Sequence, residues 1–287
     1  MPETLILDGK VIAVEIKKSI RERIAREKLD ICLAVVLVGD DPASHVYVNS
    51  KEKACAEVGF RSKVVRLPAS TSEEELLKLV AELNGDDSVT GILVQIPLPK
   101  HIREDRVIDA VSPAKDVDGL HPYNAGRLLT GTPVVSSCTP WGVMKMLEHY
   151  RIPIAGKRAV VIGRSNIVGK PMAMLLLAAN ATVTVCHSKT VNLAEVTREA
   201  DILVAAIGKP RFVTADMVKE GAVVIDVGIN RVEDALQKSG YRLEGDVDYA
   251  AVLTKASAIT PVPGGVGATT IPMLLSNTLA LYEAARK

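Results

Sequence analysis

Apolar runs alternate with amphipathic segments along most of the chain, an arrangement that is typical of α/β proteins. The run over 31–38 is continuously apolar and ends at Gly39, so it predicts a strand buried on both faces of a parallel sheet. Asp41 and Pro42 follow in the order expected for the cap and first turn of a helix. In this half of the chain we predict helices over 11–27 and 42–58, a further helix opened by Ser72, and strands over 31–38, 63–67 and 91–96.

The segment from Pro97 to Pro140 is rich in proline, which predicts loops with one short helix over 103–110. Loops between rigid elements commonly carry binding or catalytic residues. Thr139 and Pro140 then open a helix that reaches about Tyr150 and joins the two halves of the chain.

A second α/β run begins at Lys157, where a strand leads through Gly163 into a helix and a further strand, the order of a mononucleotide-binding unit. Here we predict strands over 158–162, 182–186, 202–206 and 222–227, helices over 168–179 and 193–198, and a last helix over about 270–286. The fold class is therefore α/β with two domains, an N-terminal α/β substrate domain and a C-terminal Rossmann-like, doubly wound domain. We place them at 1–140, onto which helix 270–286 packs back, and at 141–269.

Composition excludes several classes of protein. The chain has 287 residues, 48% of them hydrophobic and 24% charged, which fits soluble globular domains and excludes disordered and fibrous ones. The net charge of only +1 argues against nucleic acid or an anionic membrane as partner and favours a small molecule.

The sequence does not predict a transmembrane helix, a signal peptide or a metal site. The uncharged stretch over 256–282 is interrupted by prolines and glycines, so it does not predict a transmembrane helix. Glu3 and Asp8 do not fit a signal peptide, and we expect a cytoplasmic protein. Four widely spaced cysteines predict reduced thiols, and no metal site is expected.

The turn from Gly163 to Pro171 reads GRSNIVGKP, between a predicted strand and a predicted helix. It departs from the G-x-G-x-x-G pattern, because Ser165 stands at the second glycine position and Gly169 comes one place late. Backbone N–H groups at the helix N-terminus still suit a diphosphate. A glycine turn without a nucleotide is the alternative interpretation.

The end of the next strand indicates which dinucleotide fits. An acidic residue there would favour NAD, whereas this chain has His187, Ser188 and Lys189. Together with Arg164 these residues suit the 2′-phosphate of NADP. Solvent-exposed charges are the alternative for Lys189 and Arg164, His187 fits either phosphate contact or packing, and NAD remains open.

Catalytic candidates lie in the first half of the chain. Tyr47 and Lys51 share one face of the predicted helix, where a phenol and an amine of lowered pKa can orient a substrate and transfer a proton. Gln95 ends an apolar strand, where its amide needs partners, and Asp118 precedes Gly119 in the loop-rich segment. The alternatives are an ordinary exposed pair for Tyr47 and Lys51, a strand cap for Gln95 and a turn residue for Asp118.

Taken together, these motifs resemble the bifunctional methylenetetrahydrofolate dehydrogenase/methenyltetrahydrofolate cyclohydrolase family over nearly the whole chain. The matched strings occur in family order. They are Tyr47 with Lys51 in the helix carrying KEKAC, VQIPLP around Gln95, KDVDG around Asp118, GRSNIVGKP at Gly163, DVGIN at Asp226 and TPVPGGVG at Thr260.

The resemblance implies a homodimer with a folate-side domain and an NADP-binding domain, an active site in the cleft between them, and no metal. It implies oxidation of 5,10-methylenetetrahydrofolate by NADP and hydrolysis of the methenyl product to 10-formyltetrahydrofolate. These reactions belong to one-carbon metabolism and purine biosynthesis.

By the same resemblance Lys51 is the general acid/base, Gln95 positions it, Tyr47 stacks on the folate aryl ring and Asp118 binds the pterin. The implied cofactor-binding residues are Gly163, Arg164, Ser165, His187, Ser188 and Ile229. The implied substrate-lining residues are Tyr47, Asp118, Pro263, Gly264 and Gly265.

One stretch departs from the family. Members usually continue the PGGVG loop with Pro-Met-Thr, whereas this chain has Ala268, Thr269 and Thr270, with a proline at Pro272 instead. We expect this change to affect substrate geometry or the balance of the two activities. A dehydrogenase for another small substrate, such as shikimate, and a catalytically silent dinucleotide-binding regulator are the alternative functions. Neither explains Tyr47, Lys51, Gln95 and Asp118 together.

Overall fold

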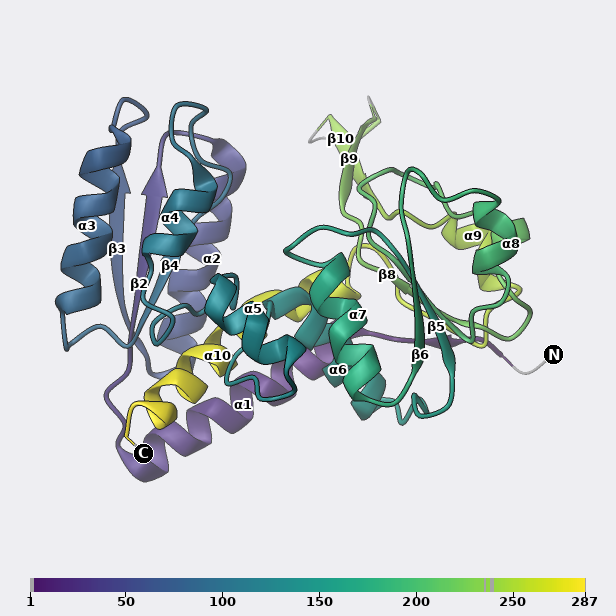
Figure 1. The fold of residues 1–287 in the computed structure, drawn as a ribbon, viewed down its shortest axis with the longest axis horizontal. Coiled ribbons are helices and arrows are strands. Elements are labelled where there is room, and N and C mark those ends of the chain that lie inside the picture. Colours follow the sequence, from purple (N-terminus) through teal and green to yellow (C-terminus); the bar gives the residue numbers. More distant parts are fainter. Residues whose placement is uncertain (1–2, 235, 238–239, 287) are drawn as a thin grey trace. The chain divides into compact units, whose positions relative to one another are not determined.

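The computed structural model describes residues 3–234, 236–237 and 240–286. The chain divides into two compact units. The three-stranded unit comprises Glu15–Cys138 and Ile271–Lys287, and the six-stranded unit comprises Met1–Val14 and Thr139–Thr270. Both are α/β, as the alternating pattern predicts (Figure 1).

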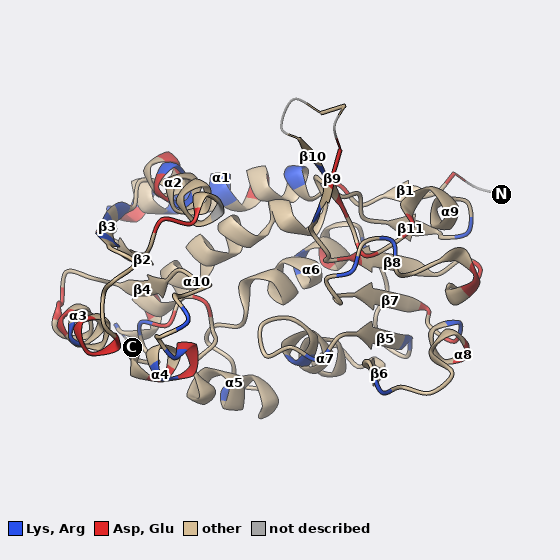
Figure 2. Ribbon diagram, turned by 90° about the horizontal axis from the view of Figure 1, so that it is seen from above, with Lys and Arg blue, Asp and Glu red and all other residues tan. Residues whose placement is uncertain are grey.

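The three-stranded unit contains a parallel sheet in the order β3-β2-β4, formed by β3 (Arg61–Leu67), β2 (Cys32–Val38) and β4 (Gly91–Val94). All seven residues of β2 are buried, as its continuous apolar run predicts. Helix α2 (Pro42–Val58) lies on one side of the sheet, and α3 (Glu73–Gly85) and α4 (Glu104–Ala110) lie on the other (Figure 2).

Local sequence explains the ends of these helices. The Asp41 side chain accepts from the Ser44 N–H at the start of α2, and Gly59 ends it at a φ of 88°, where a side chain would be strained. Ser72 and Glu75 form a reciprocal capping box at the start of α3. These signals place α2 and α3 where the sequence predicts them.

The six-stranded unit contains a fully parallel sheet in the order β1-β11-β8-β7-β5-β6. Its strands are β1 (Leu5–Ile6), β11 (Ala258–Ile259), β8 (Val223–Asp226), β7 (Ile202–Ala205), β5 (Arg158–Ile162) and β6 (Thr182–Cys186). Helices α8 (Leu193–Thr197) and α9 (Tyr249–Leu253) pack on a buried core of aliphatic residues on one face, and α7 (Gly169–Ala178) lies on the other (Figure 2). The antiparallel hairpin β9 (Asn230–Glu233) and β10 (Tyr241–Glu244) extends beside this sheet.

Three helices cross the division between the units: α1 (Gly9–Glu27), α6 (Cys138–His149) and α10 (Thr270–Ala284). The first fourteen residues, which we expected in the N-terminal domain, group instead with the six-stranded unit. The reason is that β1 pairs with β11, and the Asp8 N–H donates to the Tyr150 hydroxyl over 2.9 Å. Helix α5 (Pro122–Leu129) is a further element that the sequence did not predict.

No helix among the described residues is long and apolar enough to cross a membrane.

Candidate active site

Tyr47 and Lys51 lie one turn apart on α2, as their spacing predicts. The Tyr47 side chain is half exposed, and Lys51 is partly buried. Lys51 Nζ donates to Gln95 Oε1 over 2.6 Å, which joins α2 to the residue that follows β4. The helix thus presents an aromatic ring to solvent beside an amine that is fixed by an amide.

Gln95 is held on its other side as well. Its Nε2 donates to the Ile96 carbonyl over 2.6 Å, and its backbone N–H donates to the Val36 carbonyl over 2.8 Å. Because Nε2 has an acceptor, Oε1 must face Lys51. The partners that a half-buried amide requires are therefore a backbone carbonyl and the lysine.

Asp118 is the charged group that most strongly affects Lys51. Burial raises the pKa of Asp118 to about 6, and the positive charge of Lys51 opposes this rise. Burial likewise lowers the pKa of Lys51, and the Asp118 carboxylate opposes that change. Both groups are thus shifted toward their neutral forms, which is the condition for proton transfer near neutral pH.

Cys138 and Asp116 complete the surroundings of Asp118. Cys138 Sγ lies 3.7 Å from Asp118 Oδ1, and burial holds the pKa of this thiol well above its usual value, so the sulfur is uncharged. Asp116 is buried and accepts from the His121 N–H and from Asn124 Nδ2. Asp116 therefore shapes the loop, which leaves Asp118 as the carboxylate beside Lys51.

Sequence reasoning missed Asn277, on helix α10. This residue is 2% exposed, and its Nδ2 donates to the carbonyls of Val117 and Ser136 over 2.8 Å each. The Val117 carbonyl belongs to the loop that carries Asp118, and the Ser136 carbonyl belongs to the segment that leads into α6 at Cys138. Helix α10 also carries Thr270, Ser276 and Thr278, so its sequence pattern does not single out Asn277.

The nucleotide turn has the geometry that its glycines predict. Gly163 has a φ of 133°, and a Cβ there would lie 2.2 Å from the Ala206 carbonyl oxygen. A Cβ on Gly169 would lie 2.2 Å from the Gly163 oxygen, so α7 begins directly against the turn. Ser165 Oγ accepts from the Val168 N–H, which means that the serine in the second glycine position organises the turn.

The turn lies at the carboxyl end of β5. The chain passes from β5 to β6 on one side of it and returns to β7 on the other, so the strand order reverses here. Dinucleotides bind outside the carboxyl ends of parallel strands at such a switch point. Both the position and the glycine geometry therefore fit a dinucleotide.

The turn after β6 contains no carboxylate at 187–190. Ser188 and Lys189 are exposed there, as is Arg164 in the turn after β5. His187 Nδ1 accepts from the Lys189 N–H over 3.1 Å, so this nitrogen organises the turn. The sequence did not single out Thr190, whose hydroxyl accepts from the His187 N–H.

The TPVPGGVG loop and Ile229 lie together within the six-stranded unit. A Cβ on Gly267 would lie 2.7 Å from Ile229 Cδ1, and the Ile229 side chain is 47% exposed. Gly264 adopts a φ of 105°, and its carbonyl accepts from the Gly9 N–H, while Pro263 is exposed. A Cβ on Gly265 would lie 2.4 Å from the Pro261 oxygen. These residues form a wall of backbone and apolar side chain.

The residues that depart from the family pattern, from Ala268 to Pro272, directly follow this loop in the sequence. Thr269 is fully buried and its hydroxyl donates to the Val266 carbonyl over 2.8 Å. Pro272 lies in the first turn of α10, where a backbone N–H has no helical acceptor.

The structure thus brings Tyr47, Lys51, Gln95 and Asp118 together in the three-stranded unit. It places the other predicted residues in the six-stranded unit, at the loops after β5, β6, β8 and β11. These residues are Gly163, Arg164, Ser165, His187, Ser188, Ile229, Pro263, Gly264 and Gly265.

Comparison with known proteins finds matches to both groups of residues. Two family models match: tetrahydrofolate dehydrogenase/cyclohydrolase, catalytic domain, over residues 7–118, and the NAD(P)-binding domain of the same family over residues 137–286. The bifunctional protein FolD of Chlorobium chlorochromatii is 56% identical, with 97% of this chain and 98% of that protein covered.

Solved structures give the same result. The bifunctional FolD of Campylobacter jejuni is 50% identical with a TM-score of 0.93, covering 98% of this chain and 99% of that one. The Trypanosoma brucei methylenetetrahydrofolate dehydrogenase-cyclohydrolase, complexed with NADP cofactor and inhibitor, is 41% identical with a TM-score of 0.95 and complete coverage of both chains. The chain therefore belongs to the tetrahydrofolate dehydrogenase/cyclohydrolase family.

Proposed function

We propose that the protein oxidises 5,10-methylenetetrahydrofolate to 5,10-methenyltetrahydrofolate with NADP and then hydrolyses this product to 10-formyltetrahydrofolate. Relatives with both activities match over nearly the full length of the chain. The observation that carries the proposal is the contact between Lys51 and Gln95, with Asp118 as the nearby acid that most affects Lys51. The three side chains come from three separate segments, and a purely structural role does not require pKa shifts of Lys51 and Asp118 toward their neutral forms.

In the hydrolysis, water adds to the cationic methenyl carbon and loses a proton. The bond from that carbon to N5 then breaks, and the remaining hydroxyl proton leaves to solvent as the formyl C=O forms. Lys51 accepts the proton from water and returns one to the departing nitrogen. Burial lowers the pKa of Lys51, which raises the fraction of free amine above that of an exposed lysine. Gln95 holds Nζ in one place, so that the amine faces the reacting carbon.

Tyr47 and Asp118 bind the folate. The half-exposed ring of Tyr47 offers a face for stacking on the aryl group. Asp118 accepts hydrogen bonds from the amino-pyrimidine edge of the pterin, and its partly buried position strengthens such bonds. Both residues belong to the three-stranded unit, which we propose as the folate domain.

The six-stranded unit is proposed as the NADP domain. The glycine turn at Gly163 would hold the diphosphate of NADP, which would supply the hydride acceptor when bound. Arg164 and Ser188 bind the 2′-phosphate, since the turn at 187–190 has no carboxylate to repel it. His187 and Ile229 line the same edge of the sheet. Pro263, Gly264 and Gly265 line the substrate side of the loop after β11.

We further propose a cytoplasmic homodimer that supplies one-carbon units for purine biosynthesis, on the family resemblance. Light scattering of the purified protein, combined with size-exclusion chromatography, tests the dimer: a mass near twice 30.7 kDa supports it, and a mass near 30.7 kDa contradicts it.

The activity is tested by giving methylenetetrahydrofolate to the wild-type protein and to Lys51→Ala, with NADP and separately with NAD. Reduced cofactor and methenyltetrahydrofolate are followed by absorbance. We expect the wild type to reduce NADP with little methenyl product left, and the variant to lose cyclohydrolase activity about 100-fold or more. The variant then either accumulates methenyltetrahydrofolate or loses both steps.

Lys53→Ala is the matched control, because Lys53 is an exposed lysine on the same helix. It should retain both activities. If the wild type reduces neither cofactor, the folate assignment is wrong. If the methenyl product persists in the wild type, the Ala268–Thr269 departure has weakened the hydrolysis.

A further inference from the structure

Asp246 is a buried carboxylate in the six-stranded unit that the proposed reaction does not use. It is fully buried, and its Oδ2 accepts from the N–H groups of Ile207 and Gly208 over 2.6 and 2.9 Å. Its Oδ1 accepts from the Lys209 N–H and from Asn230 Nδ2, each over 2.9 Å. Three successive amides thus converge on one carboxylate, an arrangement that fixes the backbone of the loop after β7.

A second buried carboxylate holds Asp246 in place. Asp226 Oδ1 accepts from the N–H groups of Gly228 and Asp246, and its Oδ2 accepts from the Val247 N–H. The Asp226 N–H in turn donates to the Thr260 hydroxyl over 2.7 Å. The two aspartates therefore connect the loops that follow β7, β8, β10 and β11.

The packing around the two carboxylates leaves no room for a side chain at Gly228 or Gly245. A Cβ on Gly228 would lie 2.2 Å from Asp246 Oδ1, and a Cβ on Gly245 would lie 1.8 Å from Asp226 Oδ2. The glycine of the DVGIN motif is thus required by the carboxylate that it covers. This gives the glycine of the matched DVGIN string a physical role.

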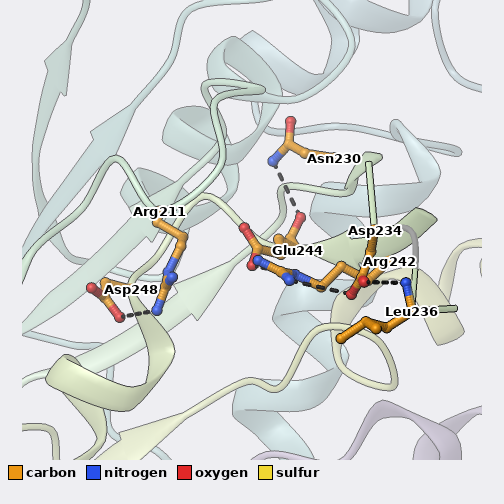
Figure 3. Close-up of polar contacts among 7 residues, drawn as sticks. All are labelled: Arg211, Asn230, Asp234, Leu236, Arg242, Glu244 and Asp248. Carbon is orange, nitrogen blue, oxygen red and sulfur yellow. Dashed lines mark hydrogen bonds and ion pairs between the residues drawn. The ribbon is translucent and has the colours of Figure 1, made fainter. Parts of the chain in front are cut away.

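The loops held by Asp246 lie at the dinucleotide edge of the sheet. The loop after β7 starts at Ala206, whose carbonyl lies against Gly163 of the nucleotide turn. Asn230 directly follows Ile229 in the sequence. Figure 3 shows Asn230 reaching the Glu244 backbone at the base of the β9–β10 hairpin, a contact of 3.2 Å. Asp246 therefore fixes two segments, the loop after β7 and Asn230 after β8, on the β7 side of the switch point.

We propose that Asp246 is a positioning residue for NADP: it fixes the loop after β7 and Asn230, and so shapes the NADP site without contacting the cofactor. The inference rests on the NADP-binding part of the proposed function. It predicts that a change at Asp246 weakens NADP binding and leaves the hydrolysis of supplied methenyltetrahydrofolate intact, since that step needs no hydride acceptor. A merely structural role would reduce both activities together.

The test is Asp246→Asn, which keeps the shape but turns an NH₂ group toward two donors. We expect the Kd for NADP, from calorimetry, and the KM for NADP to rise at least 10-fold. The cyclohydrolase rate on methenyltetrahydrofolate should stay within 2-fold. Asp248→Asn is the control, because Asp248 makes an exposed ion pair with Arg211 (Figure 3) and the change in charge is the same.

Asn230→Ala removes only one of the four donors and covers the case in which Asp246→Asn does not fold. It should raise the Kd for NADP about 3-fold and leave the cyclohydrolase rate unchanged. Wild-type affinity for NADP in Asp246→Asn, or in Asn230→Ala where the first does not fold, overturns the inference. Proportional loss of both activities in a folded variant overturns it as well. A wild type that does not bind NADP refutes the proposed function itself.

Discussion

Lys51 and Asp118 influence each other's proton affinity, and this makes a signed prediction possible. The Asp118 carboxylate, ionised above its pKa of about 6, raises the pKa of Lys51 against the effect of burial. Asp118→Asn removes that negative charge, so the pKa of Lys51 should fall further. The limb of the cyclohydrolase pH profile that reports Lys51 should therefore move to lower pH, measured as kcat/KM between pH 5 and 10.

The exposed Asp109 of α4 gives the control for this experiment, because Asp109→Asn removes the same charge from the same unit. Its pH profile should match that of the wild type. A limb that stays in place or moves to higher pH in Asp118→Asn would show that the carboxylate does not act on Lys51.

Asp226 makes a prediction about stability. Burial raises its pKa from 3.8 to about 6, although three backbone N–H groups favour the ionised form. The stability that this raised pKa contributes is present below pH 3.8 and is lost as the pH rises through 6. Each pKa unit corresponds to about 1.4 kcal/mol, so the loss is about 3 kcal/mol.

Asp226→Asn has no such titration, so the free energy of unfolding of the wild type should fall relative to that of the variant between pH 4 and 7. Urea unfolding at pH 4, 5, 6 and 7 measures this difference, whatever the absolute stability of the variant. A difference that is constant with pH would mean that Asp226 titrates normally.

Helix α10 contributes to the candidate site through Asn277. Asn277→Ala removes the amide donor that the carbonyls of Val117 and Ser136 share, which should lower the free energy of unfolding by about 1–3 kcal/mol. The KM for methenyltetrahydrofolate should rise, because the Asp118 loop loses its support, and the Kd for NADP should not change. Urea unfolding, steady-state kinetics and calorimetry measure the three quantities.

Thr278→Val is the matched control, since the buried Thr278 hydroxyl donates only to the Leu274 carbonyl within the same helix. It should affect stability slightly and the KM not at all. An unchanged KM in Asn277→Ala would limit Asn277 to a role in folding.

The elements that could be predicted from sequence are those with a hydrophobic pattern sustained over many residues or with a capping signal. Helix α2 and strand β2 begin and end within one residue of their predicted limits. The missed elements are short or exposed: β1 and β11 have two residues each, and α9 has five. The β9–β10 hairpin has exposed and half-exposed residues in strands of only four residues each, so the alternation of Tyr-Arg-Leu-Glu in β10 is too short to predict a strand.

Site residues follow a similar division. Lys51, Gln95 and Gly163 are visible in sequence because each sits in a local motif with a chemical meaning. Asn277 and Asp246 act on backbone groups far along the chain: Asn277 binds Val117, 160 positions away, and Asp246 binds Ile207, 39 positions away. A polar residue that is buried for a distant partner gives no periodic signal, so only the fold reveals it.

At the scale of the whole molecule, each unit has its own parallel sheet, and each unit holds its own group of candidate residues. The two ligands should therefore protect different parts of the chain from hydrogen exchange. NADP should slow exchange in the turns at 164–168 and 187–190, because its phosphates lie against these amides. A stable folate such as 5-formyltetrahydrofolate should slow exchange in the segments 95–98 and 116–119.

NAD supplies the control for the cofactor, since it has the same diphosphate without the 2′-phosphate. It should protect 164–168 at a sufficient concentration but protect 187–190 less than NADP does, because Ser188 and Lys189 then have no phosphate to bind. Equal protection of 187–190 by both dinucleotides would show that this turn does not select NADP. Protection by NADP of 95–98 and 116–119 alone would contradict the assignment of the six-stranded unit to the cofactor. Exchange measured by mass spectrometry on the full chain resolves these segments separately, so each unit is tested on its own amides.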